Sequence, residues 1–349
     1  MKIAMMIPSL KRGGAQKIAM DIAENNPDIF FVVIEKRVDN GMAKRIESSH
    51  KVYYLNKEPG FHPFIFWKIN RILEKEKPDV VHFHLGVSLY GLIPCFFRPK
   101  IKLIYTFHTI AEKDTEGYIR RLCRVGIKIR KMLPVAITET VRDSIKEMYN
   151  LKDVKLIYNG IDTKKYDTAA DRDDHTIHLA AIGQIWEAKN YLFMIDVIEQ
   201  LVKTDTVTKY KLMILGDGPM KEEVRSKIKM SGLMKVVDLE GDVDHVQDYL
   251  ARADIFILTS HYEGLSLATM EAMASSLPVI STNVGGMKDL IKDNGFLVEP
   301  GNKTEFVNKI ILLARNSSLR RQMGLKSAAY VKKYEKKDMQ ENYMRFYQE

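Results

Sequence analysis

The sequence predicts an α/β protein made of two Rossmann-like domains with parallel sheets. Short apolar segments of strand length alternate with longer segments of helical periodicity along the whole chain, which is typical of βαβ units. The alternation is interrupted once, by the charged and aperiodic segment 164–175, and then restarts. Because 349 residues exceed one core of ordinary size, we predict that this segment links two domains.

The predicted elements follow from this alternation. In the first domain, residues 1–165, the predicted strands are 2–7, 29–34, 80–84, 102–107 and 135–138, and the predicted helices include 15–25 and 64–76. In the second domain, residues 166–332, the predicted strands are 177–182, 212–215, 236–239, 255–258, 278–281 and 296–298. The amphipathic end of the chain, 317–349, is predicted to be helical.

Composition and cysteine use exclude several classes of protein. Cys95 and Cys123 have no partner pattern, so the sequence predicts neither a disulfide framework nor a zinc site, and a reducing cytoplasm is expected. The N-terminal apolar run is short, ends at Lys11 and lacks a cleavage site, so we predict a strand rather than a signal peptide. The apolar window 80–97 contains histidines, glycines and a proline, and predicts a strand, a turn and a short helix rather than a membrane span.

Positive charge is concentrated in the first domain. Residues 1–165 contain 30 Lys and Arg against 18 Asp and Glu, whereas the whole chain has a net charge of +9. Within this domain, segment 118–133 interleaves apolar and cationic residues at helical spacing. Such a helix would suit an anionic membrane surface or an acidic lipid carrier, or would be an ordinary surface helix. Its candidate contact residues are Arg120, Arg121, Arg124 and Lys128, and Arg12, outside this helix, is a further candidate for contact with the acceptor or the membrane. No nucleic-acid motif accompanies the charge, so nucleic acid is not an expected partner.

Segment 255–280 contains the most informative pattern. Strand 255–258 leads into a polar turn, and a helix is expected to begin near Ser266 or Leu267 and to end before Pro278. The carboxyl ends of strands in open α/β sheets face the ligand crevice. The free N–H groups of Leu265, Ser266 and Leu267 therefore predict an anion site that a diphosphate would fit.

Two carboxylates flank this predicted anion site. Glu263 precedes the helix and Glu271 follows eight positions later, which we expect to place both on nearly the same face. Acceptor-only carboxylates on either side of a phosphate suit the hydroxyls of two sugars. The alternative is that Glu263 is a helix N-terminal charge and Glu271 a solvated helix residue.

The segment EGLSLATMEAMASSLPVI, residues 263–280, resembles the E-x7-E segment of the retaining family 4 glycosyltransferases, which have the GT-B fold. Further matches follow in the family's order at Gly13-Gly14-Ala15-Gln16, 106–109, 158–162, 187–190, 215–219, 285–286 and 294–298. The resemblance implies two Rossmann-like domains whose parallel sheets face a central cleft. It also implies that a C-terminal helix, within 333–349, crosses back to the first domain.

The resemblance places a nucleotide-diphosphate sugar on the second domain and an acceptor on the first. It implies that Lys189 faces the leaving diphosphate, where a fixed cation lowers the barrier, and that Gly14 borders the donor's distal phosphate and the acceptor. The other implied donor-binding positions are Gly183, Gln184, Gly241, Val243, Glu263, Gly264, Leu265, Ser266, Leu267 and Glu271.

Histidines cluster near the ends of two predicted strands. His82 and His84 form an H-x-H pattern without a carboxylate or cysteine at matching spacing, so we interpret them as structural residues rather than metal ligands. His108 ends the strand 102–107 and matches the family's histidine beside the donor sugar. The resemblance implies that it hydrogen-bonds a sugar hydroxyl rather than acting as a free general base; the alternative is a core histidine.

Two further patterns bear on how the diphosphate is stabilised. Asp242-Val243-Asp244 matches the D-x-D string of metal-dependent transferases, but it precedes a helical run and is interpreted as a helix cap. Asp171 and Asp173 lie in the predicted linker, so no obligatory metal or other cofactor is expected. Gln184 departs from the family, which usually has an arginine there; a cation such as Arg12 from the basic domain would then assist Lys189.

We therefore predict a retaining glycosyltransferase that transfers a hexosyl unit from a nucleotide-diphosphate sugar, with a UDP-sugar favoured. The expected acceptor is a saccharide hydroxyl, lipid-linked, in cell-envelope, capsular or exopolysaccharide synthesis, and the family implies front-face displacement. The expected location is the cytoplasm, peripheral on the inner face of the membrane. The alternatives are a GT-B-fold sugar-nucleotide epimerase and a catalytically silent membrane-associated scaffold. A dehydrogenase is disfavoured because G-x-G-x-x-G is absent, and oligomeric state is not predicted.

Overall fold

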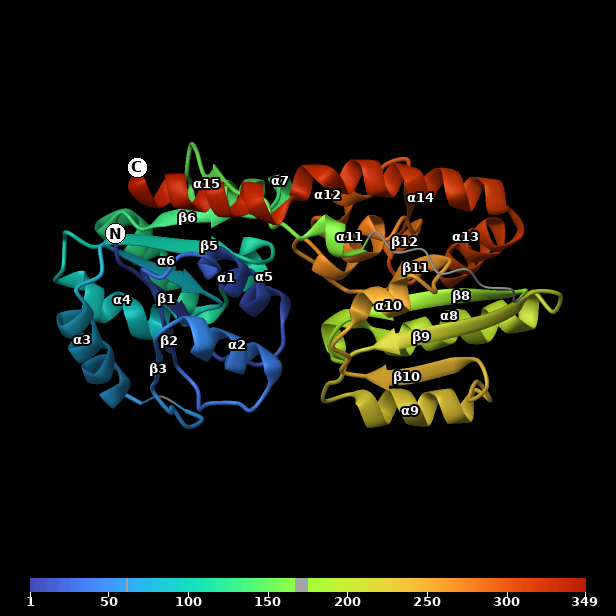
Figure 1. The fold of residues 1–349 in the computed structure, drawn as a ribbon, viewed down its shortest axis with the longest axis horizontal. Coiled ribbons are helices and arrows are strands. Elements are labelled where there is room, and N and C mark those ends of the chain that lie inside the picture. The colour runs from blue at the N-terminus through green and yellow to red at the C-terminus, as the bar shows by residue number, and fades with distance from the viewer. Residues whose placement is uncertain (61, 167–174) are drawn as a thin grey trace. The chain divides into compact units, whose positions relative to one another are not determined.

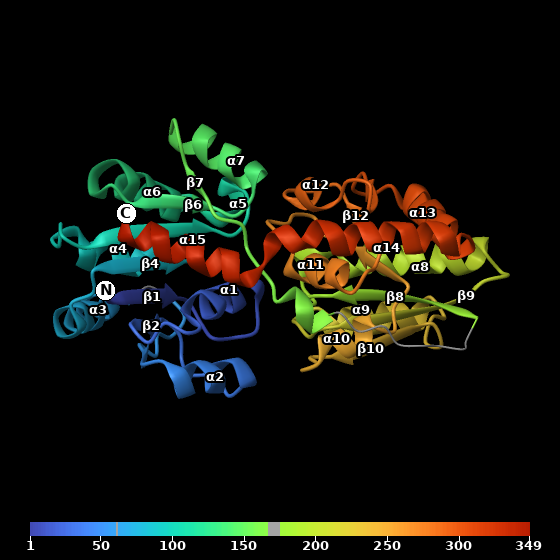
Figure 2. The ribbon, with the colours of Figure 1, turned by 45° about the horizontal axis from the view of Figure 1, so that its top comes forward.

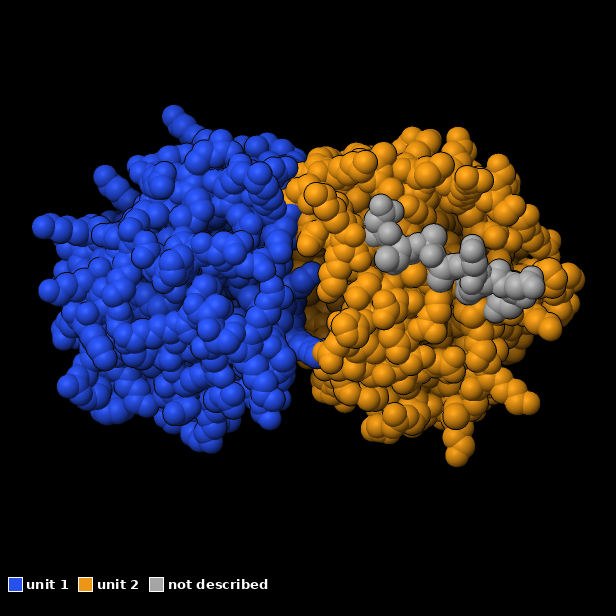
Figure 3. All heavy atoms as spheres, in the orientation of Figure 1, with its two compact units in different colours: residues 1–160, 336–349 blue, residues 161–335 orange. Residues whose placement is uncertain are grey.

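The structure is a computed structural model that describes residues 1–60, 62–166 and 175–349. Within them the chain divides into two compact units, shown in different colours in Figure 3: residues 1–160 with 336–349 form unit 1, and residues 161–335 form unit 2. Most of the predicted linker 164–175 lies outside the described residues, and so do Asp171 and Asp173.

The chain passes from unit 1 to unit 2 after Gly160 and returns to unit 1 after Glu335, whereas the predicted domain ends are 165 and 332. Ile161 forms a parallel bridge with Glu335, and its N–H donates to the carbonyl oxygen of Tyr334 at 2.9 Å. The following 3-10 helix η1 (Thr163–Tyr166) packs against helices α10 (Val246–Leu250) and α11 (Leu267–Ala274). These contacts hold residues 161–166 to unit 2.

In the described part of unit 1, seven parallel strands form one sheet in the order β3-β2-β1-β4-β5-β6-β7 (Figures 1 and 2). The central strands are almost entirely buried, as a parallel sheet covered on both faces requires. The strands are β1 (Ile3–Ile7), β2 (Ile29–Val33), β3 (Val52–Tyr54), β4 (Val80–His84), β5 (Lys102–Phe107), β6 (Leu133–Ala136) and β7 (Lys155–Leu156).

Helices connect the successive strands of unit 1. They are α1 (Gly14–Ala23), α2 (Gly41–Ser49), α3 (Phe64–Glu76), α4 (Ser88–Phe96), α5 (Ala111–Asp114), α6 (Gly117–Arg130) and α7 (Glu139–Tyr149). α3 packs against α4, and α4 packs against α6. Arg130 of α6 donates to the carbonyl oxygen of Arg98 at 2.9 Å, and Arg98 pairs with Glu74 of α3 at 3.2 Å. These bonds tie the C-terminal ends of α3, α4 and α6 together.

The C-terminal helix α15 (Lys336–Gln348) packs on unit 1, in contact with α1. Lys336 pairs with Glu24 at 2.6 Å, and Tyr343 and Tyr347 are buried against the sheet. The prediction that the C-terminal helix returns to the first domain is therefore confirmed.

The described part of unit 2 contains a six-stranded parallel sheet in the order β10-β9-β8-β11-β12-β13. Its strands are β8 (Thr176–Ile182), β9 (Lys209–Leu215), β10 (Val237–Gly241), β11 (Ile255–Leu258), β12 (Val279–Thr282) and β13 (Gly295–Val298). Its other helices are η2 (Glu187–Lys189), α8 (Tyr191–Thr204), α9 (Lys221–Met230), α12 (Met287–Leu290), α13 (Lys303–Arg315), α14 (Ser317–Val331) and η3 (Lys332–Tyr334). The predicted pair of Rossmann-like α/β units with parallel sheets is confirmed.

Candidate active site

The sheet of unit 2 has a topological switch point between its two central strands. From β8 the chain moves outward through β9 to β10, and from β11 it moves the other way through β12 to β13. β8 and β11 are paired, so the loops that follow them leave the carboxyl edge of the sheet as neighbours. Ligands of open α/β sheets bind at such a point.

An ion pair joins these two loops. Lys189 Nζ, in the loop after β8, lies 2.5 Å from Glu263 Oε1, in the loop after β11. Ser260 Oγ donates to the same carboxylate oxygen at 2.6 Å. The side chains of Lys189 and Glu263 are only 18% and 10% exposed. The structure therefore brings two of the predicted site residues together at the switch point.

Backbone contacts hold the two loops in this position. Thr259 Oγ1 donates to the carbonyl oxygen of Lys189 at 3.2 Å, and the His261 N–H donates to that of Ala188 at 2.8 Å. Gly285, with φ at +50°, supports the other side: a Cβ atom on it would lie 1.9 Å from the carbonyl oxygen of Glu263. Only glycine permits this approach, so Gly285 fixes the backbone that presents Glu263.

Helix α11 begins at Leu267, directly after the Glu263 loop, and ends at Ala274, before Pro278. Ser266 caps it, because its Oγ accepts the Thr269 N–H at 3.3 Å. Gly264, Leu265, Ser266 and Leu267 form the entrance to the helix, where an anion is favoured. Glu271 is buried on the second turn, and Glu263 lies in the loop before the helix, so the predicted start of the helix after Glu263 is confirmed.

The loop after β8 contains three predicted donor-binding residues. A Cβ atom on Gly183 would lie 3.1 Å from Lys189 Cε, so glycine at this position leaves room for the lysine side chain. The Gly183 carbonyl oxygen accepts the Tyr191 hydroxyl at 3.0 Å. Gln184 is exposed, and within the described residues its side chain has no hydrogen bond. Gln184 and Lys189 therefore follow the same strand end.

Gly241 is the last residue of β10, and Val243 lies in the loop that follows. Gly241 has φ at +73°, and its carbonyl oxygen accepts the Gly216 N–H at 2.7 Å, which joins the ends of β9 and β10. Helix α10 begins only at Val246, with His245 at the N-cap position and no side-chain cap. The prediction that Asp242 or Asp244 caps this helix is therefore wrong. In the part of the chain that the structure describes, His, Cys, Asp and Glu form no group of three or more that would hold a metal ion.

Unit 1 presents a second edge of the same kind. Its switch point lies between β1 and β4, and the loop after β1 leads into α1, which begins at Gly14. Gly13 is the N-cap residue, and no side chain caps the helix. Arg12 and Gly14 are exposed there, while His108 follows β5, the neighbour of β4. Arg12, Gly14 and His108 thus lie at one edge of the unit 1 sheet.

His108 ends a chain of hydrogen-bonded side chains that passes through the sheet. His84 Nδ1 lies 2.8 Å from His108 Nε2. The neighbouring His82 bonds the Tyr347 hydroxyl at 2.8 Å and Thr106 Oγ1 at 2.7 Å. Burial lowers the pKa of His82 and of His108 to about 3 and the pKa of His84 well below its ordinary value. The three rings are therefore neutral at neutral pH.

Met5 sets the tautomer of His108. His84 Nε2 lies 2.9 Å from Met5 Sδ, and a thioether accepts a hydrogen bond but cannot donate one, so His84 Nε2 carries the hydrogen. The Nδ1 atom of neutral His84 is then an acceptor, and His108 Nε2 donates to it. His108 Nδ1 is consequently unprotonated, and no described residue bonds it. His108 offers an acceptor, not a donor, at the edge of the sheet.

Asp114 holds the loop that carries His108, and sequence reasoning missed it. Its Oδ2 accepts the backbone N–H groups of His108 at 2.7 Å and Thr109 at 3.3 Å, and its Oδ1 accepts the Tyr105 hydroxyl at 2.7 Å. Burial raises the pKa of Asp114 to about 6. No sequence signal distinguishes this carboxylate from a surface residue of the adjacent acidic stretch.

The cations of α6 divide into two groups. Arg120 donates to the carbonyl oxygen of Thr115 at 3.0 Å, and Arg124 donates to that of Met148 at 3.0 Å, so both serve the packing of unit 1. Arg121 and Lys128 are exposed, and neither bonds another described residue. The structure therefore leaves Arg121 and Lys128 of the predicted membrane residues available to a partner.

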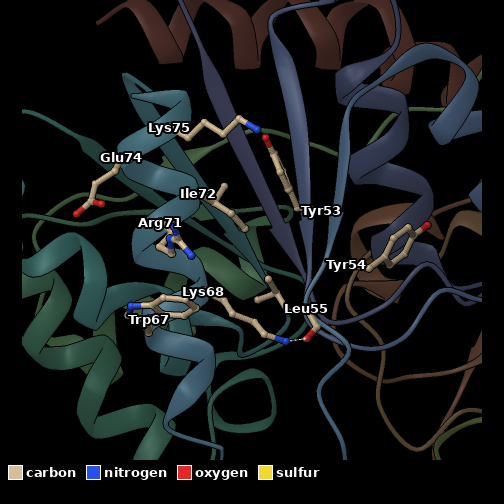
Figure 4. A pocket seen from close by; sticks show the side chains of 9 residues that line it. All are labelled: Tyr53, Tyr54, Leu55, Trp67, Lys68, Arg71, Ile72, Glu74 and Lys75. Atoms are coloured by element: carbon tan, nitrogen blue, oxygen red, sulfur yellow. Dashed lines mark hydrogen bonds between the residues drawn. The ribbon is translucent and has the colours of Figure 1, made fainter.

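A cavity of about 670 Å³ lies between the edge strand β3 and helix α3 (Figure 4). Its lining residues are Tyr53, Tyr54, Leu55, Trp67, Lys68, Arg71, Ile72, Glu74 and Lys75. Lys68 Nζ donates to the carbonyl oxygen of Leu55 at 2.8 Å, and Lys75 extends towards Tyr53 while Glu74 points away. None of the predicted site residues lines this cavity.

Two parallel-sheet Rossmann-like units, with a C-terminal helix on the first, define the GT-B class of glycosyltransferase. The chain belongs to the family 4 glycosyltransferases: the model described as Glycosyltransferase Family 4 matches residues 14–165, and the model described as Glycosyl transferases group 1 matches residues 176–316. The protein is therefore a glycosyltransferase, and the predicted family is confirmed.

Individual relatives agree with this assignment. The chain is 25% identical over 363 residues, covering 99% of this chain and 98% of the relative, to a Campylobacter jejuni enzyme named as an α-1,4-N-acetyl-D-galactosaminyltransferase acting on a diNAcBac-PP-undecaprenol-linked saccharide. It is 25% identical, over 69% of this chain and 67% of the relative, to an Escherichia coli α-1,3-galactosyltransferase named for UDP-Gal and GlcNAc-diphosphoundecaprenol. Anabaena HepE, solved with UDP and glucose, shares the fold with a TM-score of 0.85 at 20% identity, over 99% of each chain.

A helix that crosses a bilayer needs about 20 consecutive, mainly apolar residues. Within the described residues, no helix is both long and apolar enough to do so.

Proposed function

We propose that this glycosyltransferase takes its sugar from a nucleotide-diphosphate donor, a UDP-sugar, held at the carboxyl edge of the unit 2 sheet. The observation that carries the proposal is the buried Lys189–Glu263 pair, which joins the loops at the switch point beside the start of α11. A fixed cation and a helix N-terminus on the same edge suit a diphosphate. The structure of HepE with UDP and glucose supports the choice of UDP.

The pair has a role for each member in the proposed reaction. With a donor bound, Lys189 stabilises the negative charge that grows on the leaving diphosphate. Glu263, released from part of its contact with Lys189, accepts a hydrogen bond from a sugar hydroxyl. Glu271, one helix turn beyond the entrance of α11, binds the nucleoside hydroxyls.

We propose transfer with retention by front-face displacement. The acceptor oxygen bonds to the anomeric carbon as the bond from that carbon to the phosphate oxygen breaks, and the acceptor's proton passes to the departing phosphate. His108 takes no proton, because its pKa of about 3 keeps it neutral and poorly basic. Its free Nδ1 acceptor holds a sugar hydroxyl instead. No metal ion is needed in this scheme.

The proposed acceptor is a lipid-linked saccharide used in cell-envelope polysaccharide synthesis, bound at the edge of unit 1 beside Gly14. The names of the Campylobacter jejuni and Escherichia coli relatives, which include undecaprenol-linked acceptors, support this choice. The positive charge of residues 1–165 agrees with an anionic diphosphate lipid and with a place on the inner face of the cell membrane.

The donor proposal is tested by thermal unfolding with UDP, GDP, ADP and dTDP. A ligand at about a hundred times its dissociation constant adds roughly 2.7 kcal/mol, so UDP should raise Tm by about 2 to 4 °C. No shift with any of the four would overturn the donor site. Incubation of UDP-sugars with and without saccharide acceptors then separates transfer from epimerisation, and NMR of the product's anomeric proton tests retention.

A further inference from the structure

The exposed apolar side chains of unit 1 gather on one layer of helices. Among the described residues, nine large hydrophobic side chains of unit 1 are exposed, and eight of them belong to α3, α4 and α6 or their ends. The most exposed are Phe64 and Trp67 on α3, Phe97 after α4, and Tyr118 and Ile129 on α6, which are 49% to 84% exposed. In unit 2, such residues are spread over loops and separate helices.

These three helices are adjacent, so their outer sides form one surface, which we call the three-helix face. α4 packs between α3 and α6, and Figures 1 and 2 both show α3 beside α4. Near the starts of the helices, Phe66 and Tyr90 have ring centroids 5.6 Å apart; near their ends, Arg98 and Arg130 link the helices as described above. Exposed apolar groups concentrated in this way mark an interaction site.

The same face is strongly cationic. The segments 64–77, 88–100 and 117–131 contain twelve Lys and Arg and two Glu. Glu74 already pairs with Arg98, and Glu76 is buried against Lys2 and Lys51. Arg121 and Lys128 lie on the exposed side of α6 with Tyr118 and Ile129. Apolar and positive groups therefore point outward from the same helices.

We propose that the three-helix face docks on an anionic lipid bilayer. Aromatic and aliphatic side chains amid lysine and arginine match the boundary between acyl chains and negative headgroups. A second copy of this chain is a poorer partner, because a symmetric pair would bring two positive faces together. Nucleic acid supplies the charge but nothing to cover Phe97 and Ile129. Arg71 and Lys75 line the cavity beside Trp67, and these two cations extend the positive charge to the border of the three-helix face.

The three-helix face includes α3 and α4 as well as α6, the helix that the sequence predicted as a membrane contact. α6 supplies Tyr118, Arg121, Lys128 and Ile129, whereas α3 and the end of α4 supply the exposed tryptophan and phenylalanines. The proposal deepens the proposed function, on which it rests only for the choice of a lipid partner. Binding to vesicles is therefore measured together with the UDP-induced rise in Tm, so that failure of one does not obscure the other.

The test is co-sedimentation of the full chain with vesicles of phosphatidylcholine alone and of phosphatidylcholine with phosphatidylglycerol. The protein should bind the anionic vesicles, and more weakly at high salt. The double variant R121Q/K128Q should bind about thirtyfold more weakly, because each basic residue near an anionic surface contributes about 1 kcal/mol. The double variant F97S/I129S should also bind less. Both should keep the UDP-induced shift in Tm.

Matched variants of unit 2 serve as controls. K229Q/K235Q removes two exposed charges, and V207S/M230S removes two side chains that are 86% and 88% exposed. Neither should change vesicle binding. The proposal is overturned if the wild-type chain does not bind anionic vesicles, if the control pairs lose as much binding as the test pairs, or if size-exclusion chromatography shows a dimer that only the test pairs abolish.

Discussion

The carboxyl edges of the two sheets occupy equivalent places in their units but have opposite chemistry. The edge of unit 2 carries a buried ion pair, Lys189 with Glu263, beside the start of a capped helix. The edge of unit 1 carries His108, a neutral ring held by His84 and by the Asp114 loop. We propose a corresponding division of labour, in which the ion pair of unit 2 serves the donor diphosphate and the neutral His108 of unit 1 serves a sugar hydroxyl.

The same comparison shows how each edge is kept rigid. In unit 2 the ion pair connects two loops, and Gly285 lets a third approach their backbone. In unit 1, His108 is held by its hydrogen bond to His84 of β4, and His84 in turn contacts Met5 of β1. Removal of the Lys189 charge should therefore lower the catalytic rate. Protonation of the buried histidines should instead lower the stability of unit 1.

The largest expected effect is at the charged edge. K189A should lower kcat by about a hundredfold or more, because it removes a cation placed where negative charge develops. The matched control is K203A, which breaks an exposed ion pair with Glu199 on α8 and should leave kcat unchanged. If the two variants have the same kcat, Lys189 does not face the reacting phosphates.

The second prediction concerns acid, and it should separate the two units. The pKa of His82, His84 and His108 is lower in the folded state than the unfolded value of about 6.5, so their stabilisation is complete above pH 6.5 and is lost as pH falls below it. Asp21 and Asp114, whose pKa is raised to about 6, take up protons on folding below that pH and offset part of the loss. We expect unit 1 to lose on the order of 3 kcal/mol between pH 7 and pH 5.

Unit 2 should change less over this range. Lys221 and Lys326 lower the pKa of Asp217 and Asp293, whose stabilisation is lost only below about pH 4. Burial raises the pKa of Tyr191 and Tyr210 above the ordinary value of a tyrosine, so neither titrates between pH 5 and pH 7. Each unit has one tryptophan, Trp67 or Trp186, so thermal unfolding of W186F and W67F by fluorescence reports unit 1 and unit 2 separately. If the two Tm values fall equally from pH 7 to pH 5, the claim that acid destabilises unit 1 more than unit 2 is contradicted.

The third prediction strengthens the charged edge. Q184R should fold normally and bind UDP about tenfold more tightly, since a hydrogen bond to a charged group contributes about 1.5 to 3 kcal/mol and this position is partly screened by solvent. Q322R, which adds the same charge on α14, is the control. Isothermal calorimetry that shows unchanged or weaker UDP binding by a well-folded Q184R chain would mean that position 184 does not face the diphosphate.

The smallest effect should come from the neutral edge. M5L keeps the volume of a buried side chain but removes the acceptor of His84 Nε2–H, so His108 Nδ1 becomes protonated in part of the molecules. We expect kcat to fall by up to about tenfold, the value of one hydrogen bond. M6L, on the next residue of β1, is the control. Nitrogen NMR reads the tautomers directly, and an unchanged His108 tautomer in M5L would show that Met5 does not set it.

Much of this fold could be predicted from the sequence because the buried strands are distinct apolar runs. β4, β5 and β11 begin and end where the pattern predicts. The short strands β3 and β7 were missed, since they have only three and two residues and are only partly buried. Amphipathicity likewise predicted α3. It did not predict that Phe64 and Trp67 of this helix are exposed, because that depends on how α3 packs against α4.

The candidate site was predicted less completely. Lys189 and Glu263 were singled out separately, yet nothing in a stretch of sequence shows that residues 74 positions apart form an ion pair; strand order decides that. The pattern correctly predicted that the helix begins after Glu263, near Ser266 or Leu267, because the capping serine and the following apolar run are local signals. Asp114 and Met5 act only through tertiary contacts, so no local pattern indicated them.

The central claim is that the charged edge of unit 2 holds the donor diphosphate, and a crystal structure of the chain soaked with UDP tests it most directly. The account predicts the two phosphates at the start of α11, with Lys189 Nζ within hydrogen-bond distance of a phosphate oxygen and the ribose near Glu271. UDP bound elsewhere, for example in the cavity beside Trp67, with the Lys189–Glu263 pair unchanged, would contradict it.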